Sequence, residues 1–114
     1  MIIQGGNEPI VISFDPEIQV ADMADISAVL CLHNTSAIHN VEAIFKRWSK
    51  SDMDIDEAEN VVSCPLTQQE TMDFKPGKIG FEMKWISRKT GYVGHLKVTD
   101  IEVSDRDDER ILEV

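Results

Sequence analysis

The sequence predicts an all-β protein, an antiparallel β-sandwich of about seven strands that includes one short helical turn. Runs of roughly five to ten residues alternate apolar and polar side chains, which is the period of a strand with one buried face. Gly, Pro, Asn or Asp stand between most of these runs, and these residues favour turns. The 114 residues fit a single domain, 1–114, in which we expect a flexible arm at residues 1–8 and a charged tail at residues 104–114.

Two apolar segments open the chain. Ile2 and Ile3 are suited to pair with the edge of a sheet. Residues 10–14 alternate large apolar residues with valine and serine, which predicts the first confident strand, and Asp15-Pro16 ends it.

A loop and a central strand are expected next. Residues 17–25 show no sustained period, so we expect a loop that can hold a turn of helix at residues 20–24. In residues 26–32 apolar side chains occur at both parities, which is typical of a strand covered on both faces. This segment is the candidate central strand.

Residues 36–48 allow two interpretations. Their apolar residues recur at helical spacing, with Ser36 available as an N-cap. A strand at residues 43–50 also fits, because β-branched and aromatic residues gather near the end of the segment. We favour the strand, since a helix here would be isolated among strands, and both interpretations stay open from the sequence alone.

An acidic connection and a further strand follow. Residues 51–60 are rich in aspartate and glutamate, with a short strand indicated around Met53 and Ile55. Residues 60–66 alternate again and predict the strand that leads into the helical turn.

The helical turn is predicted at residues 67–73. The Thr67 hydroxyl can accept from the Glu70 amide while the Glu70 side chain reaches back to the Thr67 amide, the reciprocal pattern of a capping box. Pro76 keeps the helix short, and Pro76-Gly77 fits the centre of a type II turn.

The last two strands form a predicted hairpin. Residues 79–88 place large apolar side chains at every second position, and Gly91 suits the left-handed conformation of the connecting turn. In the return strand the apolar residues before and after Thr99-Asp100 differ in parity. A β-bulge at these two residues would bring them onto one face, because one extra residue shifts the alternation.

The charge of the chain argues against several partners. With 11 basic and 21 acidic residues the formal net charge is -10, which repels phosphate backbones and anionic lipid surfaces. No apolar run approaches the roughly 18 residues of a membrane-spanning helix, and the first residues lack the pattern of an export signal. We therefore expect neither nucleic acid nor a membrane as a partner.

Cysteine and histidine residues predict no reactive or metal site. Cys31 and Cys64 each lie in an apolar run, which predicts two buried thiols in a reducing compartment rather than a disulfide or a nucleophile. His33, His39 and His95 match no recognised metal-ligand spacing, so we expect surface histidines.

The acidic connection matches part of the pattern of a calcium-binding loop. Asp52, Asp54 and Asp56 alternate as oxygen ligands do in such loops. The sixth position, which needs glycine, is Glu57, and the twelfth, which needs a carboxylate, is Ser63. A solvated acidic hairpin is the preferred interpretation.

Three aromatic residues are the remaining candidates for a ligand site. Trp48, Trp85 and Tyr92 would form a platform for a carbohydrate if their rings were exposed together, but aromatic residues at inward strand positions belong more often to a core. The sequence thus predicts no catalytic, cofactor-binding or metal-binding residue, no cofactor and no enzymatic activity.

Several segments resemble a known family of proteins. They are GGNEPIVISFD at 5–15, DISAVLCL at 25–32, KRWSKSDMDID at 46–56, LTQQETMDFKPGK at 66–78, EMKW at 82–85 and the acidic IEVSDRDDERILEV at 101–114. Together they resemble small β-sandwich structural proteins of tailed bacteriophages and prophages of Gram-positive bacteria. They are similar to the N-terminal immunoglobulin-like domain of phage upper baseplate proteins.

The resemblance implies an immunoglobulin-like sandwich and a non-enzymatic component of a virion, made in the bacterial cytoplasm. Its partners would be other virion proteins or further copies of itself, as a homo-oligomer. Strand addition at a sheet edge is the expected mode of contact, with the Gly5-Gly6 arm and the apolar residues of 111–114 as further contact elements. The alternative is a small carbohydrate- or ligand-binding module that uses exposed aromatic rings.

Overall fold

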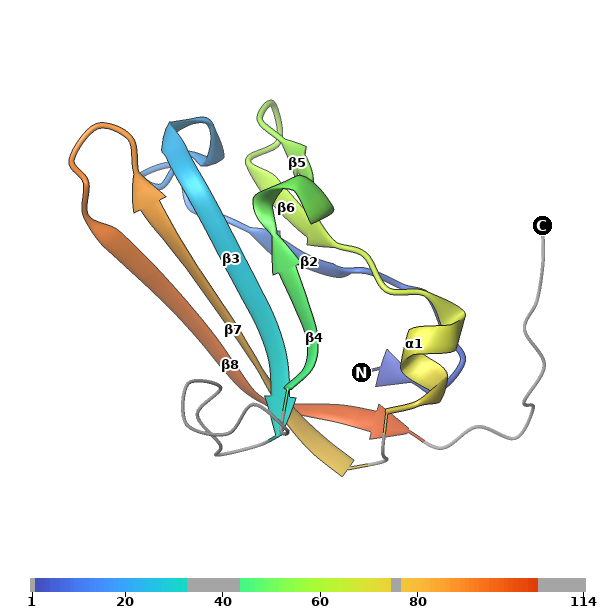
Figure 1. Ribbon diagram of the computed structural model, residues 1–114. Helices are drawn as coiled ribbons and strands as arrows, with labels where there is room; N and C mark the ends of the chain where they lie inside the picture. The colour runs from blue at the N-terminus through green and yellow to red at the C-terminus, as the bar shows by residue number, and fades with distance from the viewer. Residues whose placement is uncertain (1, 33–43, 75–76, 105–114) are drawn as a thin grey trace.

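Eight strands and three short helical elements make up the part of the chain that the computed structural model describes, residues 2–32, 44–74 and 77–104 (Figure 1). The strands are β1 (Ile2–Ile3), β2 (Ile10–Ser13), β3 (Met23–Leu32), β4 (Ile44–Ser49), β5 (Asp54–Asp56), β6 (Val61–Cys64), β7 (Gly77–Ser87) and β8 (Val93–Ser104). The helical elements are α1 (Gln68–Met72) and the 3-10 turns η1 (Val20–Asp22) and η3 (Lys50–Asp52).

The strands form two packed sheets. The larger sheet has five strands in the order β1-β8-β7-β3-β4, and the smaller sheet has three strands in the order β2-β6-β5. Every pair is antiparallel except β1 with β8. The predicted all-β sandwich is confirmed, and α1, the one α-helix among the described residues, lies within the predicted residues 67–73.

β3 lies inside the larger sheet, between β7 and β4, as expected for a central strand. It begins at Met23, earlier than the predicted residue 26, and Met23 pairs with Ser87 of β7. The register shifts between Met23 and Asp25, so the side-chain alternation that marks a strand in the sequence is broken there. η1 lies within the helical turn allowed at residues 20–24.

The hairpin of β7 and β8 contains the predicted bulge. Ile79 pairs with Ile101 and Phe81 pairs with Val98, so two residues of β8 oppose Gly80 alone. The extra residue falls at the predicted pair, residues 99–100, and restores the apolar side chains of β8 to one face. Gly91 in the turn has a φ of 74°, the left-handed conformation expected for it.

β4 settles part of the ambiguous segment. Residues 44–49 form a strand, as favoured, while residues 33–43, with the alternative helix cap Ser36, lie outside the described residues. Pro76 of the predicted type II turn and residues 105–114 of the predicted tail also lie outside them. Gly77 is described and has a φ of 132°.

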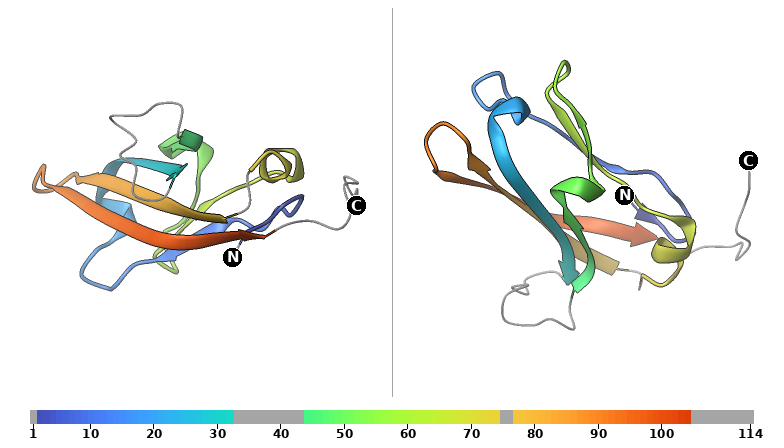
Figure 2. Two further views of the ribbon diagram at one scale, coloured as in Figure 1. Left: turned by 90° about the horizontal axis from the view of Figure 1, so that it is seen from below. Right: turned by 45° about the horizontal axis from the view of Figure 1, so that its top comes forward.

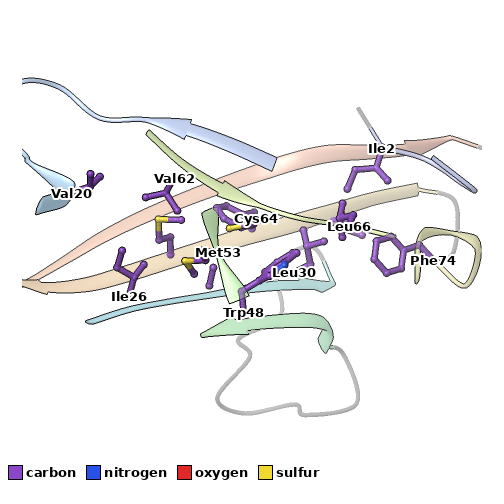
Figure 3. Close-up of a cluster of buried hydrophobic side chains, with 14 of the residues drawn as sticks. Ile2, Val20, Ile26, Leu30, Trp48, Met53, Val62, Cys64, Leu66 and Phe74 are labelled. Atoms are coloured by element: carbon purple, nitrogen blue, oxygen red, sulfur yellow. The ribbon is translucent and has the colours of Figure 1, made fainter. Parts of the chain in front are cut away.

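The core fills the space between the two sheets (Figure 3). Leu30, Val62, Cys64 and Phe81 are completely buried there, and Trp48 is only 2% exposed. The side chains from alternating positions of β7 face this core, as the sequence predicted. Val29 and Cys31 of β3, which point to the other face of the sheet, are buried as a separate pair, so this strand has buried side chains on both faces, as expected.

The first residues of the chain are attached to the end of the sandwich. Ile2 is buried and runs beside the end of β8, as expected for a segment able to pair with a sheet edge. The buried Gln4 side chain donates to the Phe74 carbonyl oxygen, and the Thr71 hydroxyl donates to the Gly6 carbonyl oxygen at 2.7 Å. The first part of the expected arm is therefore held by the larger sheet and by α1.

Candidate interaction surfaces

The two long sides of the sandwich differ in how the sheets are joined. β4 continues directly through η3 into β5, so the β4 edge of one sheet and the β5 edge of the other lie on the same side. β2 and β8 are then at the opposite side, as the left view in Figure 2 shows. We call the first the closed side and the second the open side.

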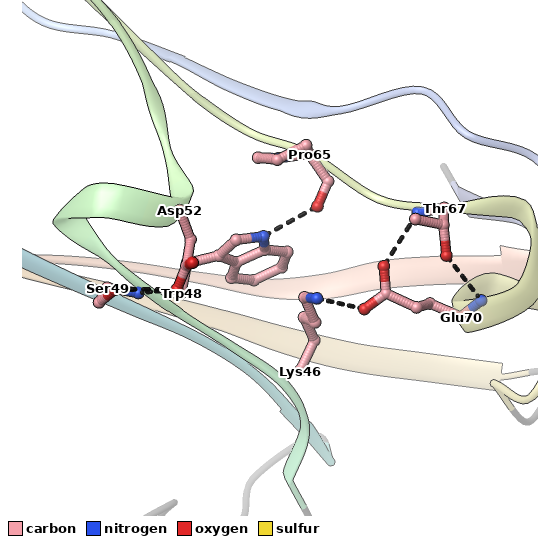
Figure 4. A network of polar contacts seen from close by, with 7 residues as sticks. All are labelled: Lys46, Trp48, Ser49, Asp52, Pro65, Thr67 and Glu70. Atoms are coloured by element: carbon pink, nitrogen blue, oxygen red, sulfur yellow. Dashed lines mark hydrogen bonds and ion pairs between the residues drawn. The ribbon is translucent and has the colours of Figure 1, made fainter.

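Trp48 joins the sheets at the closed side (Figure 4). Its ring contacts Phe81 edge-to-face, with centroids 6.2 Å apart, and its indole Nε1 donates to the Pro65 carbonyl oxygen at 2.8 Å. A buried indole N–H needs such a partner, and here the partner comes from the chain that leaves β6. Trp48 is thus a core residue, and it is not available as part of a carbohydrate platform.

Glu70 fixes α1 to the same side. One carboxylate oxygen accepts from the Thr67 amide at 3.1 Å, the Thr67 hydroxyl accepts from the Glu70 amide at 3.1 Å, and the second carboxylate oxygen pairs with Lys46. The predicted capping box is confirmed. Burial alone would raise the pKa of Glu70, but the bonds from Lys46 and Thr67 stabilise the carboxylate and lower that pKa below its usual value.

Two aspartates of the acidic connection, Asp52 and Asp56, stabilise local turns. Asp52 accepts from the Ser49 amide at 2.9 Å and from the Ser49 hydroxyl at 2.8 Å, and these bonds lower its pKa. Asp56 accepts from the Glu59 amide at 3.1 Å in the turn between β5 and β6. Within residues 2–32, 44–74 and 77–104, no three His, Cys, Asp or Glu side chains gather where they could hold a metal ion.

The open side carries strand edges and half-buried apolar residues. β8 pairs with β1 only at Val103 and Ser104, so its edge over residues 93–102 has no strand partner in the described chain. β2 pairs only with β6, so its outer edge is free in the same sense. The apolar residues that are only partly buried along these two strands are Ile10, Ile12, Leu96, Val98 and Ile101.

Two of the three candidate aromatic rings lie at the tip of the β7–β8 hairpin. Tyr92 is 78% exposed. Trp85 is half-buried, and its ring packs edge-to-face on Phe14, with the ring centroids 5.2 Å apart. Both rings line one depression of about 490 Å³, together with Ile18 and Val93. The structure therefore separates Trp48 from the other two rings.

The outer face of the larger sheet carries basic residues. Arg47 of β4, Lys84 of β7 and Lys97 of β8 line a shallow depression of about 310 Å³ with His95 and one acid, Glu82. Lys97 lies 3.5 Å from the Glu82 carboxylate. Arg47 and Lys84 have no ion-pair partner among the described residues. We call these five residues the basic face.

Histidine and cysteine residues occupy separate places. His95 is exposed on the basic face, while His33 and His39 lie outside the described residues. Cys31 and Cys64 are free and buried, as predicted. Burial raises the pKa of Cys64 to about 12 and, with the nearby Glu82 carboxylate, also raises the pKa of Cys31, while Lys97 opposes that rise.

Comparisons with known proteins identify no relative of this chain. No protein-family model, no curated protein and no solved structure matches the chain. Among the described residues no helix is long and apolar enough to cross a membrane.

Sequence analysis missed the basic face as a unit. Four of its residues lie on the β7–β8 hairpin, but Arg47 lies on β4, which is distant in the chain. Only β3, where Val29 pairs with both Arg47 and Glu82, brings Arg47 into one row with them. The outward parity of these positions was a usable signal, because each neighbours an inward apolar residue on its own strand. The order of the strands in the sheet was the missing information.

Proposed function

We propose that this protein is a non-enzymatic structural or assembly module that acts through protein–protein contacts. The open side supports the proposal: the edge of β8 over residues 93–102 is free in the described chain and is bordered by half-buried Leu96 and Val98. A free strand edge offers backbone hydrogen-bonding groups, and adjacent apolar side chains add contact area for a further strand. Strand addition from a partner protein or another copy is the proposed mode.

The proposed setting is a virion of a tailed phage or prophage, in a tail or baseplate position. This part of the proposal rests on the resemblance of residues 5–15, 25–32, 46–56, 66–78 and 82–85 to small sandwich proteins of such particles. The protein would then be made in the bacterial cytoplasm and incorporated into particles there. Its partners would be other virion proteins or itself.

One substitution tests the edge. Val98→Lys places a charge beside the free edge of β8, where it would obstruct an incoming strand while its long side chain reaches solvent over the rim. Ile86→Lys is the matched control, because it adds the same charge at a 37% exposed apolar residue of β7, a strand that is paired on both sides. Urea unfolding of both variants checks that each remains folded.

The readout is incorporation into particles. Particles induced from the strain that carries the gene are purified on a density gradient and probed for the tagged protein. We expect the wild type and Ile86→Lys in the particle fraction and Val98→Lys in the soluble fraction. Wild-type protein that never enters particles would refute the virion assignment, and a Val98→Lys protein that enters them normally would refute the role of the β8 edge.

A second candidate function is binding of a small carbohydrate at the hairpin tip. The observation that favours it is that Trp85 and Tyr92 line the same depression, since sugar rings stack on exposed aromatic faces. Titration of tryptophan fluorescence with a panel of oligosaccharides tests it. A saturable change that Tyr92→Ala abolishes would favour binding, and an unchanged signal across the panel would refute it.

A further inference from the structure

The two outer faces of the sandwich carry charge of opposite sign. The basic face on the larger sheet combines Arg47, Lys84 and Lys97 with a single acid, Glu82. On the smaller sheet, Ile55 packs toward the core, so Asp54 and Asp56 on either side of it point outward and are exposed. In residues 52–59 five acidic residues occur without a basic one. We call residues 52–59 the acidic hairpin.

The basic face is unusual in this chain. In this protein the 21 acidic residues outnumber the 11 basic ones, so a local excess of positive charge marks a place where negative groups bind best. Glu82 neutralises only one of the three cations, through Lys97 at 3.5 Å. Arg47 and Lys84 are exposed and are left without an ion-pair partner in the described residues.

We infer that the acidic hairpin of one copy docks on the basic face of a second copy. The width of the basic face matches the width of the acidic hairpin. The row from Arg47 across Val29 and Glu82 to Lys97 crosses four strands and is about 14 Å wide. A two-stranded hairpin with its side chains covers that width. Asp54 and Asp56 are two residues apart on one strand face, about 7 Å, so they reach two different cations.

The contact joins different surfaces of the two copies, so it is heterologous. After the first contact, one copy still has a free basic face and the other still has a free acidic hairpin. Further copies can bind at these two surfaces, and repeating the contact yields a ring or a filament. The surfaces are polar and small, so we expect a weak contact that assembly elsewhere can reinforce. This inference concerns a different surface from the β8 edge and does not depend on a phage origin.

Salt defines the expected behaviour of the contact. At physiological ionic strength the Debye length is about 8 Å, so facing patches attract while remote acidic groups of the two copies are largely screened from each other. At about 1 M salt the Debye length falls to about 3 Å and the attraction of the patches is lost. Association should therefore be present at physiological salt and absent at high salt.

Charge reversal on either surface tests the inference. Arg47→Glu with Lys84→Glu reverses two cations that have no ion-pair partner to lose in the described chain. Asp54→Lys with Glu57→Lys reverses the hairpin and leaves the local bond of Asp56 to Glu59 intact.

The matched control is Lys78→Glu with Lys89→Glu, which has the same change in net charge as the first pair but lies outside the basic face. Lys89 loses only a surface pair with Asp22, which contributes little.

The measurement is sedimentation equilibrium at protein concentrations up to about 1 mM, the range of weak protein contacts. We expect the wild type and the control to associate. Each reversal variant should associate at least about tenfold more weakly than the wild type. An equimolar mixture of the two reversal variants should recover association, because each supplies the surface that is complementary to the other. A monomeric wild type overturns the inference. So does a reversal variant that associates like the control, or a mixture that stays monomeric.

The same experiment separates this contact from strand addition. Val98→Lys leaves both charged surfaces unchanged, so it should associate like the wild type in this assay. If Val98→Lys alone abolishes association while the charge-reversal variants keep it, the β8 edge forms the contact and the inference is overturned, but the proposed function stands.

Discussion

Asn60 holds the loop between β2 and β3 from a position on the neighbouring hairpin. Its amide Nδ2 lies 3.1 Å from the Phe14 carbonyl oxygen and 2.8 Å from the Ile18 carbonyl oxygen, and its Oδ1 accepts from the Val20 amide at 2.8 Å. Its φ of 60° is a left-handed conformation that asparagine tolerates better than most residues. One side chain thus satisfies backbone groups that the loop cannot pair by itself.

We expect Asn60→Ala to destabilise the fold by about 2–3 kcal/mol, since it removes these hydrogen bonds and leaves an alanine at positive φ. Asn60→Gly separates the two effects, because glycine adopts the backbone conformation without strain but still lacks the side-chain bonds. Urea unfolding of the two variants gives the comparison. If the glycine variant is as stable as the wild type, the hydrogen bonds of Asn60 do not support the loop.

At the scale of elements, the packing of β7 on β8 depends on a glycine, Gly94, which leaves room for the Trp85 ring. Gly94 pairs with Trp85 across the hairpin, and the tryptophan ring lies so close that a Cβ on Gly94 would be 2.3 Å from its Cε2. The ring covers the backbone there and also reaches Phe14 at the end of β2. This packing joins the hairpin to the smaller sheet.

Gly94→Ala should therefore destabilise the protein by about 2–3 kcal/mol, because the ring must leave its place on the backbone. Gly80→Ala is the control on the neighbouring strand, where the nearest atom to a new Cβ is 3.6 Å away and nothing must move. Thermal unfolding with tryptophan fluorescence measures both. Equal losses in the two variants would show that glycine flexibility, and not the Trp85 contact, decides stability here.

The link between α1 and β4 predicts a dependence on pH. The pKa of Glu70 is lowered in the folded protein by Lys46 and Thr67, against the effect of burial, so its carboxylate stabilises the fold. A lowered folded pKa gives stability that is complete above the ordinary value of 4.5 and is lost as the pH falls through the folded pKa.

Urea unfolding of the wild type and Glu70→Gln between about pH 3 and pH 7 should show this. We expect the difference in unfolding free energy to be largest near neutral pH and to vanish at the acid end. Glu57→Gln, which changes an exposed carboxylate in the turn after β5, is the control and should change the unfolding free energy little at neutral pH. A difference for Glu70→Gln that stays constant with pH would contradict the assigned ion pair.

At the scale of the whole molecule, the sandwich is asymmetric. The closed side is joined by Trp48 with Pro65 and by Lys46 with Glu70. The open side has partly exposed apolar residues and strand edges that are unpaired within the described residues. The five-stranded sheet is also wider than the three-stranded sheet that covers it. The protein therefore has one side completed by its own contacts and one side whose strand edges have no partner in the described chain.

The thiol of Cys64 should report opening of the whole sandwich. It lies at the centre of the core with no exposed surface, and burial raises its pKa to about 12, so native thiolate is scarce at pH 8. In a Cys31→Ala variant, a thiol reagent should react with Cys64 at least about a thousandfold more slowly without urea than in it, because only the unfolded chain is reactive. Rapid labelling of the native variant would show that the sheets separate locally around Cys64.

Several features of this fold are local, and the sequence by itself determined them. The capping box of Thr67 and Glu70, the turn at Gly91 and the bulge at residues 99–100 each depend on the conformational preferences of a few adjacent residues. The alternation that faces Phe81 and its neighbours to the core follows from the pleat of a single strand.

Other features depend on which strands become neighbours, and only the tertiary structure decided them. The basic face exists because β4, β3, β7 and β8 lie side by side, and the closed side exists because Trp48 meets the chain at Pro65. Asn60 reaches the loop at Ile18 only when β6 packs beside β2. Such contacts join residues that are far apart in the chain, and their energy comes from packing and pairing that no local pattern of residues specifies.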